Sequence, residues 1–255
     1  MTKLLHKSIT EIIRKVNPDF GYKKSDVILG SYPKSGRNWV MFLLANTMLE
    51  HRGINLEANF HNIHDIIPEK IPTESTVEGF PRLMATHKEE SVVGNSPKVI
   101  YLVRHPGDVM ESYFHFLRGR YEKELGSFSE FIRCKDYGIP AWKSHVNSWK
   151  SNWDVLIRFE DLKDNTLGEL EKIVSILDKP IKDKTLKSAM EKSSFERMRE
   201  IEQQKGLPYK KGANPNYQFM RKGKAQKGEN YFDEEDYRFL CEQAGKLLEF
   251  FKYEC

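Results

Sequence analysis

Cysteine is scarce in this chain of 255 residues. The three cysteines, Cys134, Cys241 and Cys255, are odd in number and form no Cys-x-x-Cys pair. A disulfide framework needs paired cysteines, and a structural zinc site needs closely spaced ligands. The sequence therefore argues against both, and it favours a reducing, cytoplasmic location.

Long apolar runs are also missing. The longest, Trp39 to Leu49, is interrupted by Asn46 and Thr47 and is too short to span a bilayer, so we expect no integral membrane contact. From Met1 to Val16, apolar residues recur at helical spacing with Lys and Arg between them, which is typical of an amphipathic helix and not of a signal peptide. We expect this helix to dock on the core; contact with a membrane surface is the alternative.

The chain has no large excess of charge of one sign. Its 41 basic and 37 acidic residues leave a net charge of +4. Such a mild excess suits an anionic ligand in a local pocket better than a nucleic acid, so we expect no nucleic-acid partner.

The pattern of strands and helices predicts one α/β domain over residues 1–255, with a mostly parallel central sheet flanked by helices. Short β-branched or aromatic runs, each followed by a helical pattern, predict strands at Val27–Tyr32, Val99–Val103 and Asp154–Phe159, with a weaker candidate at Arg82–Thr86. Helices are expected at Asn38–Glu50, Pro106–Leu117, Ala141–Ser151, Leu167–Leu177, Lys184–Lys192 and Asp233–Phe251.

The first candidate site is the loop Ser31-Tyr-Pro-Lys-Ser-Gly-Arg-Asn-Trp39, between a predicted strand and a predicted helix. Gly36 lets backbone amides approach a ligand, and the positive end of the helix points to the same place. This arrangement binds phosphate, and Lys34 adds a positive charge. The loop is P-loop-like but is not a Walker A motif, because no GxxxxGK[ST] is present. An ordinary strand–turn–helix connection is the alternative.

The second candidate site lies in Val99-Ile-Tyr-Leu-Val-Arg-His-Pro-Gly-Asp-Val-Met-Glu-Ser112. Arg104 closes a buried strand, and Ser112 falls about two turns into the following helix. An arginine at the carboxyl end of a strand needs an anion or a carboxylate. A structural salt bridge to Asp108 is the alternative.

In these two motifs the sequence resembles the PAPS-dependent sulfotransferases of the cytosolic type, where PAPS is 3′-phosphoadenosine 5′-phosphosulfate. YPKSGRNW resembles their 5′-phosphosulfate loop, and VIYLVRHPGDVMESYFHF resembles their 3′-phosphate motif. The likeness continues, in the order of the family, through WKSHVNSW, IRFEDL, SSFERM and FMRKG. It implies transfer of a sulfuryl group to a hydroxyl, or to an amine, of a small-molecule acceptor, with PAPS as the donor, 3′-phosphoadenosine 5′-phosphate (PAP) as the product and no metal.

The resemblance also implies roles for single residues. Lys34 would contact the bridging oxygen of the phosphosulfate and stabilise the leaving phosphate. His87, in Met-Ala-Thr-His, would be the general base. The 5′-phosphate would be held by Ser35, Gly36, Arg37 and Asn38. The adenine would stack on Trp39 and Phe195. The 3′-phosphate would be held by Arg104, Ser112, Arg221, Lys222 and Gly223. The other residues expected on the nucleotide side are Phe159, Ser193, Ser194, Met198, Phe219 and Met220.

The sequence departs from the family at several positions. Ala85 stands where the family often has a lysine, two residues before the histidine, and either Lys88 or Arg37 is a candidate to replace its charge. Arg37-Asn38 replaces the usual Thr-Thr, and Phe159 replaces a tyrosine. The short C-terminal dimerisation motif of the animal enzymes is not recognisable around 231–237, and the sequence leaves the oligomeric state open.

The segment from Gln203 to Gly228 contains seven basic residues and no acidic one. Its glycines and prolines argue against a long helix or strand, and we expect a mobile basic lid that bound nucleotide orders and closes over the acceptor. A solvated run of charge is the alternative. For the whole chain, the alternatives to a sulfotransferase are a P-loop-like phosphoryl-transfer enzyme and a non-catalytic nucleotide- or polyanion-binding protein.

Overall fold

Four parallel strands form the centre of the molecule. The computed structural model describes residues 21–90, 97–208, 210–220 and 231–255. The sheet has the order β2-β1-β3-β4, and its strands are β1 (Val27–Ser31), β2 (Leu83–Thr86), β3 (Lys98–Val103) and β4 (Val155–Arg158). Every neighbouring pair is parallel. All four strand predictions and the predicted α/β class with a parallel sheet are therefore confirmed.

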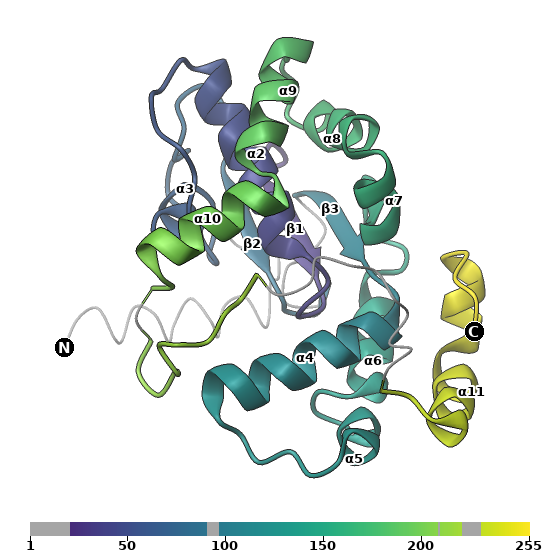
Figure 1. Ribbon diagram of the computed structural model, residues 1–255. Helices are drawn as coiled ribbons and strands as arrows, with labels where there is room; N and C mark the ends of the chain where they lie inside the picture. The colour runs from purple at the N-terminus through teal and green to yellow at the C-terminus, as the bar shows by residue number, and fades with distance from the viewer. Residues whose placement is uncertain (1–20, 91–96, 209, 221–230) are drawn as a thin grey trace, which may run out of the picture.

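Helices cover both faces of the sheet (Figure 1). They are α2 (Arg37–His51), α3 (Ile63–Ile66), α4 (Pro106–Tyr121), α5 (Phe128–Arg133), α6 (Ile139–Trp149), α7 (Phe159–Asp164), α8 (Thr166–Ser175), α9 (Asp183–Lys192), α10 (Phe195–Lys205) and α11 (Glu234–Phe250). All six predicted helices are present within a few residues of their expected ends, except that α4 continues to Tyr121. Four helices, α3, α5, α7 and α10, were not predicted from the sequence. Of these, α3, α5 and α7 have at most six residues each.

Alternating side chains of the strands feed two separate cores. Val27 and Leu29 pack with α2, α8 and α9 on one face of the sheet. Ile28 and Tyr101 pack with α4, α6 and α11 on the other face. Because both faces are covered, the strands are apolar throughout, which is why their sequences show runs and not alternation.

One disulfide bond joins Cys241 on α11 to Cys255, with 5.6 Å between the Cα atoms. The third cysteine, Cys134, is free. A single bond is not a framework, but the odd cysteine count gave no indication of this pair. The cytoplasmic location inferred from the cysteines stays a prediction.

Two other expectations concern the termini and membranes. The amphipathic helix expected at Met1–Val16 lies outside the described residues. Within the part of the chain that the structure describes, no helix has the length and apolarity needed to cross a bilayer.

A buried ion pair joins the amino-terminal ends of three strands. Asp26 is fully buried, and its carboxylate accepts hydrogen bonds from Nε of Arg82 at 2.8 Å, from Nη2 of Arg82 and from the amide of Lys23 at 2.7 Å. Its carbonyl oxygen accepts from the amide of Lys98, and the carbonyl of Arg82 accepts from the amide of Val27. This pair therefore sets the register at which β1, β2 and β3 begin.

We expect Arg82→Met to destabilise the fold strongly, because it leaves the Asp26 carboxylate buried without a countercharge. Removing one partner of a buried pair costs about 3–5 kcal/mol, which lowers Tm by roughly 10 °C in a chain of this size. Thermal melting measures the change. Arg52→Met is the matched control, since Arg52 pairs with Glu78 on the surface at 3.0 Å and such pairs contribute little. Equal melting of the two variants would show that the buried pair does not organise the sheet.

Candidate active site

The carboxyl ends of the strands bring the two predicted motifs together. Parallel pairing places Ser31 beside Leu102, and Val103 beside Arg158. The residues that follow each strand therefore meet at one edge of the sheet, which is where ligands of open α/β sheets bind.

The loop between β1 and α2 has the backbone of an anion site. Lys34 and Gly36 have left-handed φ angles of 68° and 105°, which turn the chain tightly into the helix. A Cβ atom at Gly36 would lie 2.5 Å from the ring of Phe159, so only glycine fits there. Ser35 is buried, and its hydroxyl has no hydrogen-bond partner among the described residues. An orphaned hydroxyl beside the free amides of a helix start fits a phosphate group.

Lys34 is held between aromatic rings. Its ammonium lies 4.2 Å from the centre of the Phe116 ring and 4.0 Å from that of Phe219. Its carbonyl oxygen accepts a hydrogen bond from Nη1 of Arg104 at 3.4 Å. The rings stabilise the cation without neutralising its charge.

Arg104 lies beside this loop, as the sequence predicted. Its guanidinium carbon is 4.3 Å from the centre of the Phe159 ring. Trp39 meets the same ring edge to face, with 5.8 Å between the centroids. The salt bridge that the sequence left as an alternative also exists, at 3.4 Å from Arg104 to Asp108. Ser112 lies two turns into α4 and is half-buried. The structure thus places Trp39, Arg104 and Phe159 together around Gly36.

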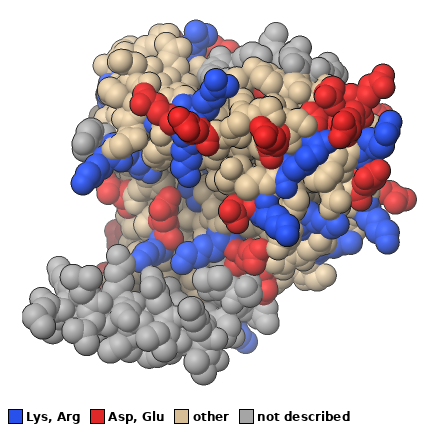
Figure 2. All heavy atoms as spheres, turned by 90° about the horizontal axis from the view of Figure 1, so that it is seen from below, with Lys and Arg blue, Asp and Glu red and all other residues tan. Residues whose placement is uncertain are grey.

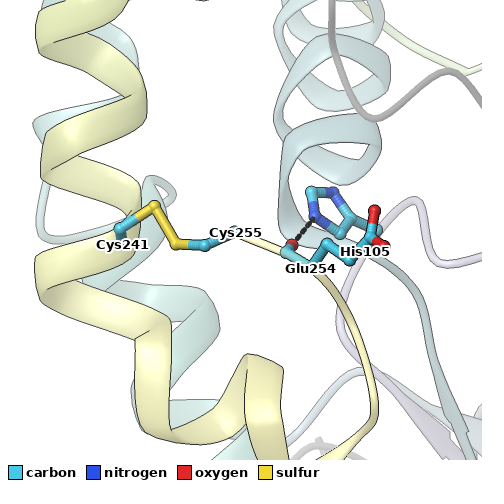
Figure 3. The surroundings of a disulfide bond; sticks show 4 residues. All are labelled: His105, Cys241, Glu254 and Cys255. Carbon is cyan, nitrogen blue, oxygen red and sulfur yellow. Dashed lines mark hydrogen bonds between the residues drawn. A yellow bond between two sulfur atoms is a disulfide. The ribbon is translucent and has the colours of Figure 1, made fainter.

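The C-terminal residues contact the segment that follows Arg104, and no local pattern in the sequence predicts this contact. Nδ1 of His105 accepts from the amide of Gly107, so Nε2 carries the proton and donates to the carbonyl of Glu254 at 3.2 Å (Figure 3). Glu160 accepts from the amide of His105 at 3.0 Å and from the hydroxyl of Tyr253 at 2.6 Å. The disulfide at Cys255 anchors this tail to α11 (Figure 3). The residue next to Arg104 is therefore fixed by two segments distant in sequence, α7 and the C-terminal tail.

His87 follows β2 and is tied to the end of β1. Its Nδ1 lies 2.7 Å from the carbonyl oxygen of Ser31. A carbonyl only accepts, so Nδ1 carries the proton and Nε2 presents a lone pair, as a base requires. Burial lowers the pKa of His87 to about 3, and the positive charge of Arg37 is the second cause. The imidazole is therefore neutral at physiological pH.

A second histidine, His145, is buried and lies near the half-buried His87. His145 of α6 accepts or donates at Nδ1 with the hydroxyl of Tyr101, 3.1 Å away, and stacks on that ring. Burial lowers its pKa to about 4. The sequence analysis did not single out either residue, because a histidine and a tyrosine 44 positions apart give no local signal.

The structure shows where Ala85 lies, and where the two candidates to replace the missing lysine charge lie. Ala85 is fully buried and its amide donates to the carbonyl of Pro68. Lys88 is exposed. Arg37 is buried, and its charge acts on His87. Of the two candidates to replace the missing lysine, Arg37 is therefore the one whose charge reaches the histidine.

The predicted residues of α9 and α10 make structural contacts. Ser193 is buried and accepts a hydrogen bond from Asn46 at 3.0 Å, while Ser194 caps α10 by accepting from the amide of Arg197. Met198 packs in the core, and Phe195 is half-buried at the start of α10. Their roles toward a nucleotide stay predictions.

The described half of the basic segment is attached to the body of the protein. Arg120 of α4 donates to the carbonyls of Pro208 and Asn214. Glu202 of α10 accepts from the amides of Phe219 and Met220. Arg221, Lys222 and Gly223 lie outside the described residues. Ordering of the segment by nucleotide and its closure over the acceptor also stay predictions.

Surface charge on the visible face does not form a single-sign field. Figure 2 shows Lys and Arg interspersed with Asp and Glu there. Over residues 21–90, 97–208, 210–220 and 231–255, no group of three or more His, Cys, Asp or Glu is arranged to hold a metal ion. Among the described residues, the cations at the carboxyl edge of the sheet include Lys34, Arg37 and Arg104, which are half-buried or buried.

Comparison with known proteins shows the family to which the chain belongs. Residues 24–250 match the family described as "Sulfotransferase domain". The chain belongs to the sulfotransferase family. Rat sulfotransferase 2A2 is 31% identical over 242 residues, which cover 87% of this chain and 84% of the relative. Dog sulfotransferase 1B1 is 30% identical over 265 residues, which cover 91% of this chain and 88% of the relative.

Solved structures share the fold of this sulfotransferase. A crystal structure of retinol dehydratase with androsterone and PAP superposes with a TM-score of 0.71 at 20% identity, over 93% of this chain and 85% of that chain. A mouse sulfotransferase complexed with PAP gives a TM-score of 0.65 at 22% identity, over 94% and 93% of the two chains. The predicted fold and enzyme class are confirmed, and PAPS is the sulfuryl donor of this family.

We expect Gly36→Ala to abolish nucleotide binding, because the new methyl group would overlap the Phe159 ring at a left-handed φ of 105°. Calorimetry with PAP measures the affinity. Gly53→Ala is the matched control: its φ of 64° imposes the same kind of strain, but nothing lies within 4 Å of the added Cβ. If both variants bind PAP like the wild type, the loop does not hold the nucleotide.

We expect the His87 ring to stay unprotonated between pH 8 and pH 5, because its pKa is about 3 in the folded protein. The unfolded chain takes up this proton below about pH 6.5, so His87 makes folding less favourable as pH falls from there toward 3. Ring NMR signals, assigned with His87→Gln, should not move over that range while free histidine in the buffer titrates. The His87→Gln variant should also lose less Tm than wild type between pH 7 and pH 5. A midpoint near 6.5 for His87 would contradict the neutral buried base.

Proposed function

We propose that this protein transfers the sulfuryl group of PAPS to the hydroxyl of a small-molecule acceptor, with His87 as the general base and Lys34 beside the leaving phosphate. The observation that carries the proposal is the bond from Nδ1 of His87 to the carbonyl of Ser31. This bond places the proton of the neutral imidazole on Nδ1 and leaves the lone pair on Nε2. It also ties His87 to Ser31, where the loop that carries Lys34 begins.

The residues of the loop fit the donor. The unpaired hydroxyl of Ser35 and the first amides of α2 suit a 5′-phosphate. Arg104 suits the 3′-phosphate, with Ser112 as its proposed companion. Trp39 and Phe159 present aromatic surface beside Gly36, to which the half-buried Phe195 would add on the adenine. When bound, PAPS supplies the sulfuryl group and leaves as PAP, keeping the electron pair of the broken S–O bond on its phosphate.

In this reaction the side chains of His87, Lys34 and the two phenylalanines beside Lys34 have separate tasks. Nε2 of His87 takes the proton of the acceptor hydroxyl as the new S–O bond forms, which a neutral imidazole can do. The ammonium of Lys34 stabilises negative charge that grows on the phosphate oxygen. The phenyl rings of Phe116 and Phe219 hold that ammonium and keep water away from it.

The acceptor class draws support from the neighbours in fold. Retinol dehydratase was crystallised with androsterone and with retinol, both of them small molecules. The non-catalytic alternative predicts nucleotide binding without turnover, so a transfer assay separates it from the proposed enzyme.

We expect His87→Ala to lower turnover by about 10²–10⁴-fold while PAP affinity stays near the wild-type value, because the general base does not hold the nucleotide. Lys34→Ala should lower both turnover and PAP affinity, since its charge acts on the ground state as well as the transition state. The assay measures transfer from radiolabelled PAPS to a panel of phenols and steroid alcohols, and calorimetry measures PAP binding.

The control is His51→Ala, an exposed histidine at the end of α2. Loss of PAP affinity in His87→Ala as large as in Lys34→Ala would make His87 a binding residue. Tight PAP binding by the wild type without transfer to any acceptor would overturn the enzymatic role.

A further inference from the structure

Arg37 carries a buried positive charge that has too few partners. Its side chain is 8% exposed, and its Nε is buried without a hydrogen-bond partner. The one ion pair that it makes within the described residues joins Nη2 to Oε1 of Glu69 at 3.4 Å, which is long for a charge-assisted bond. Burying a guanidinium is costly unless its donors are satisfied. The site is therefore short of an anion.

The helix directs Arg37 away from the nucleotide residues. Arg37 is the first residue of α2, and Trp39 is two residues further. Side chains two positions apart on an α-helix differ in direction by about 200°, so they lie on nearly opposite sides. Trp39 packs against Phe159 on the side of Arg104. Arg37 pairs instead with Glu69, in the segment between α3 and β2.

Two histidines, one of them the proposed base, lie near the charge of Arg37. The positive charge of Arg37 contributes to the lowered pKa of His87, after burial. At His64 on α3, burial lowers the pKa, Glu69 raises it and Arg37 lowers it again. Geometry agrees, because Arg37 pairs with Glu69, and the neighbouring Pro68 accepts a hydrogen bond from the amide of Ala85, two residues before His87.

We infer that Arg37 binds an anionic group of the acceptor, so that the acceptor is a hydroxyl compound that also carries a carboxylate, or a sulfate or phosphate group. The inference rests on the proposed function, because it names the substrate class of the same site. A planar guanidinium with a free Nε–H and a loosely held Nη2 forms the two parallel hydrogen bonds that an oxyanion accepts. An acceptor held there by its anion would present its hydroxyl to Nε2 of His87.

Glu69 acts as a placeholder for that anion. Its side chain is 62% exposed and meets Arg37 at a single long contact. The carboxylate can therefore rotate out toward solvent when a second oxyanion arrives. Exchange of one carboxylate for another keeps the guanidinium paired throughout. A neutral acceptor has nothing to exchange and leaves the Arg37–Glu69 pair in place.

The test uses acceptors that differ in charge and hardly in shape. One set pairs 3- and 4-hydroxybenzoate with the corresponding hydroxybenzamides, and a second pairs 3- and 4-hydroxybenzenesulfonate with the sulfonamides, which separates planar from tetrahedral oxyanions. The wild type should prefer the anion in at least one pair by ~10-fold or more in kcat/KM. Arg37→Gln should bring that ratio within about 3-fold of unity, and Arg37→Lys should restore part of it. Glu69→Gln should raise kcat/KM for the anion, because it removes the competing carboxylate.

Binding measurements separate this inference from the proposed function. Calorimetry titrates each acid and amide into the PAP-bound protein, and PAP into Arg37→Gln. An anion preference in binding that Arg37→Gln removes supports the inference even where no acceptor is sulfated, an outcome that would overturn the proposed function alone. Turnover without an anion preference overturns the inference alone. Loss of PAP affinity in Arg37→Gln as large as in Lys34→Ala also overturns it, since Arg37 would then serve the nucleotide.

Discussion

The parallel register of the four strands is the constraint on which the site depends. Asp26 and Arg82 fix where β1, β2 and β3 begin, at the edge opposite the site. Because strands that begin together and pair in parallel also end together, Ser31, His87 and Arg104 meet at the other edge. The bond from His87 to the carbonyl of Ser31 is possible only in this register. A slip of one residue would turn the side chains of a strand to the other face of the sheet.

The start of α2 divides the site into two sides. Gly36 faces the ring of Phe159, and Trp39 and Arg104 meet that ring as well. Arg37 leaves the same helix in the opposite direction, toward Glu69. A tight loop can serve both substrates of a transfer reaction in this way, because the side chains of successive residues at the start of a helix point in different directions around its axis. The loop then sets the distance between donor and acceptor through covalent geometry.

The sequence predicted the parts of the structure that have local signals. The apolar runs predicted the strands, and the spacing from Arg104 to Ser112 predicted two turns of helix after a strand end. The short helix α5 was missed although Ser127 and Glu130 form a capping box, because six residues carry too little periodicity.

Contacts across long distances in sequence could not be predicted at all. The tail that fixes His105 through Glu254, and the disulfide that anchors it, depend on where α11 packs. The direction of Arg37 likewise depends on tertiary structure. The sequence assigned it to the 5′-phosphate by family resemblance, and whether it serves the donor or the acceptor is decided by the rotation of α2 and by the path of the segment that carries Glu69.

The charge of Arg37 also bears on how well His87 can act as a base. A histidine whose pKa is about 3 is always neutral in the working range of pH, but it binds a proton weakly. Efficient proton transfer needs a base whose pKa is nearer to the ambient pH. Glu69 meets Arg37 at a single contact of 3.4 Å, so an acceptor anion that makes two closer hydrogen bonds would cancel more of the field that lowers the pKa of His87. An anionic acceptor would thus raise the pKa of the base that removes its proton, whereas a neutral acceptor would leave the Arg37–Glu69 pair, and the weaker base, unchanged.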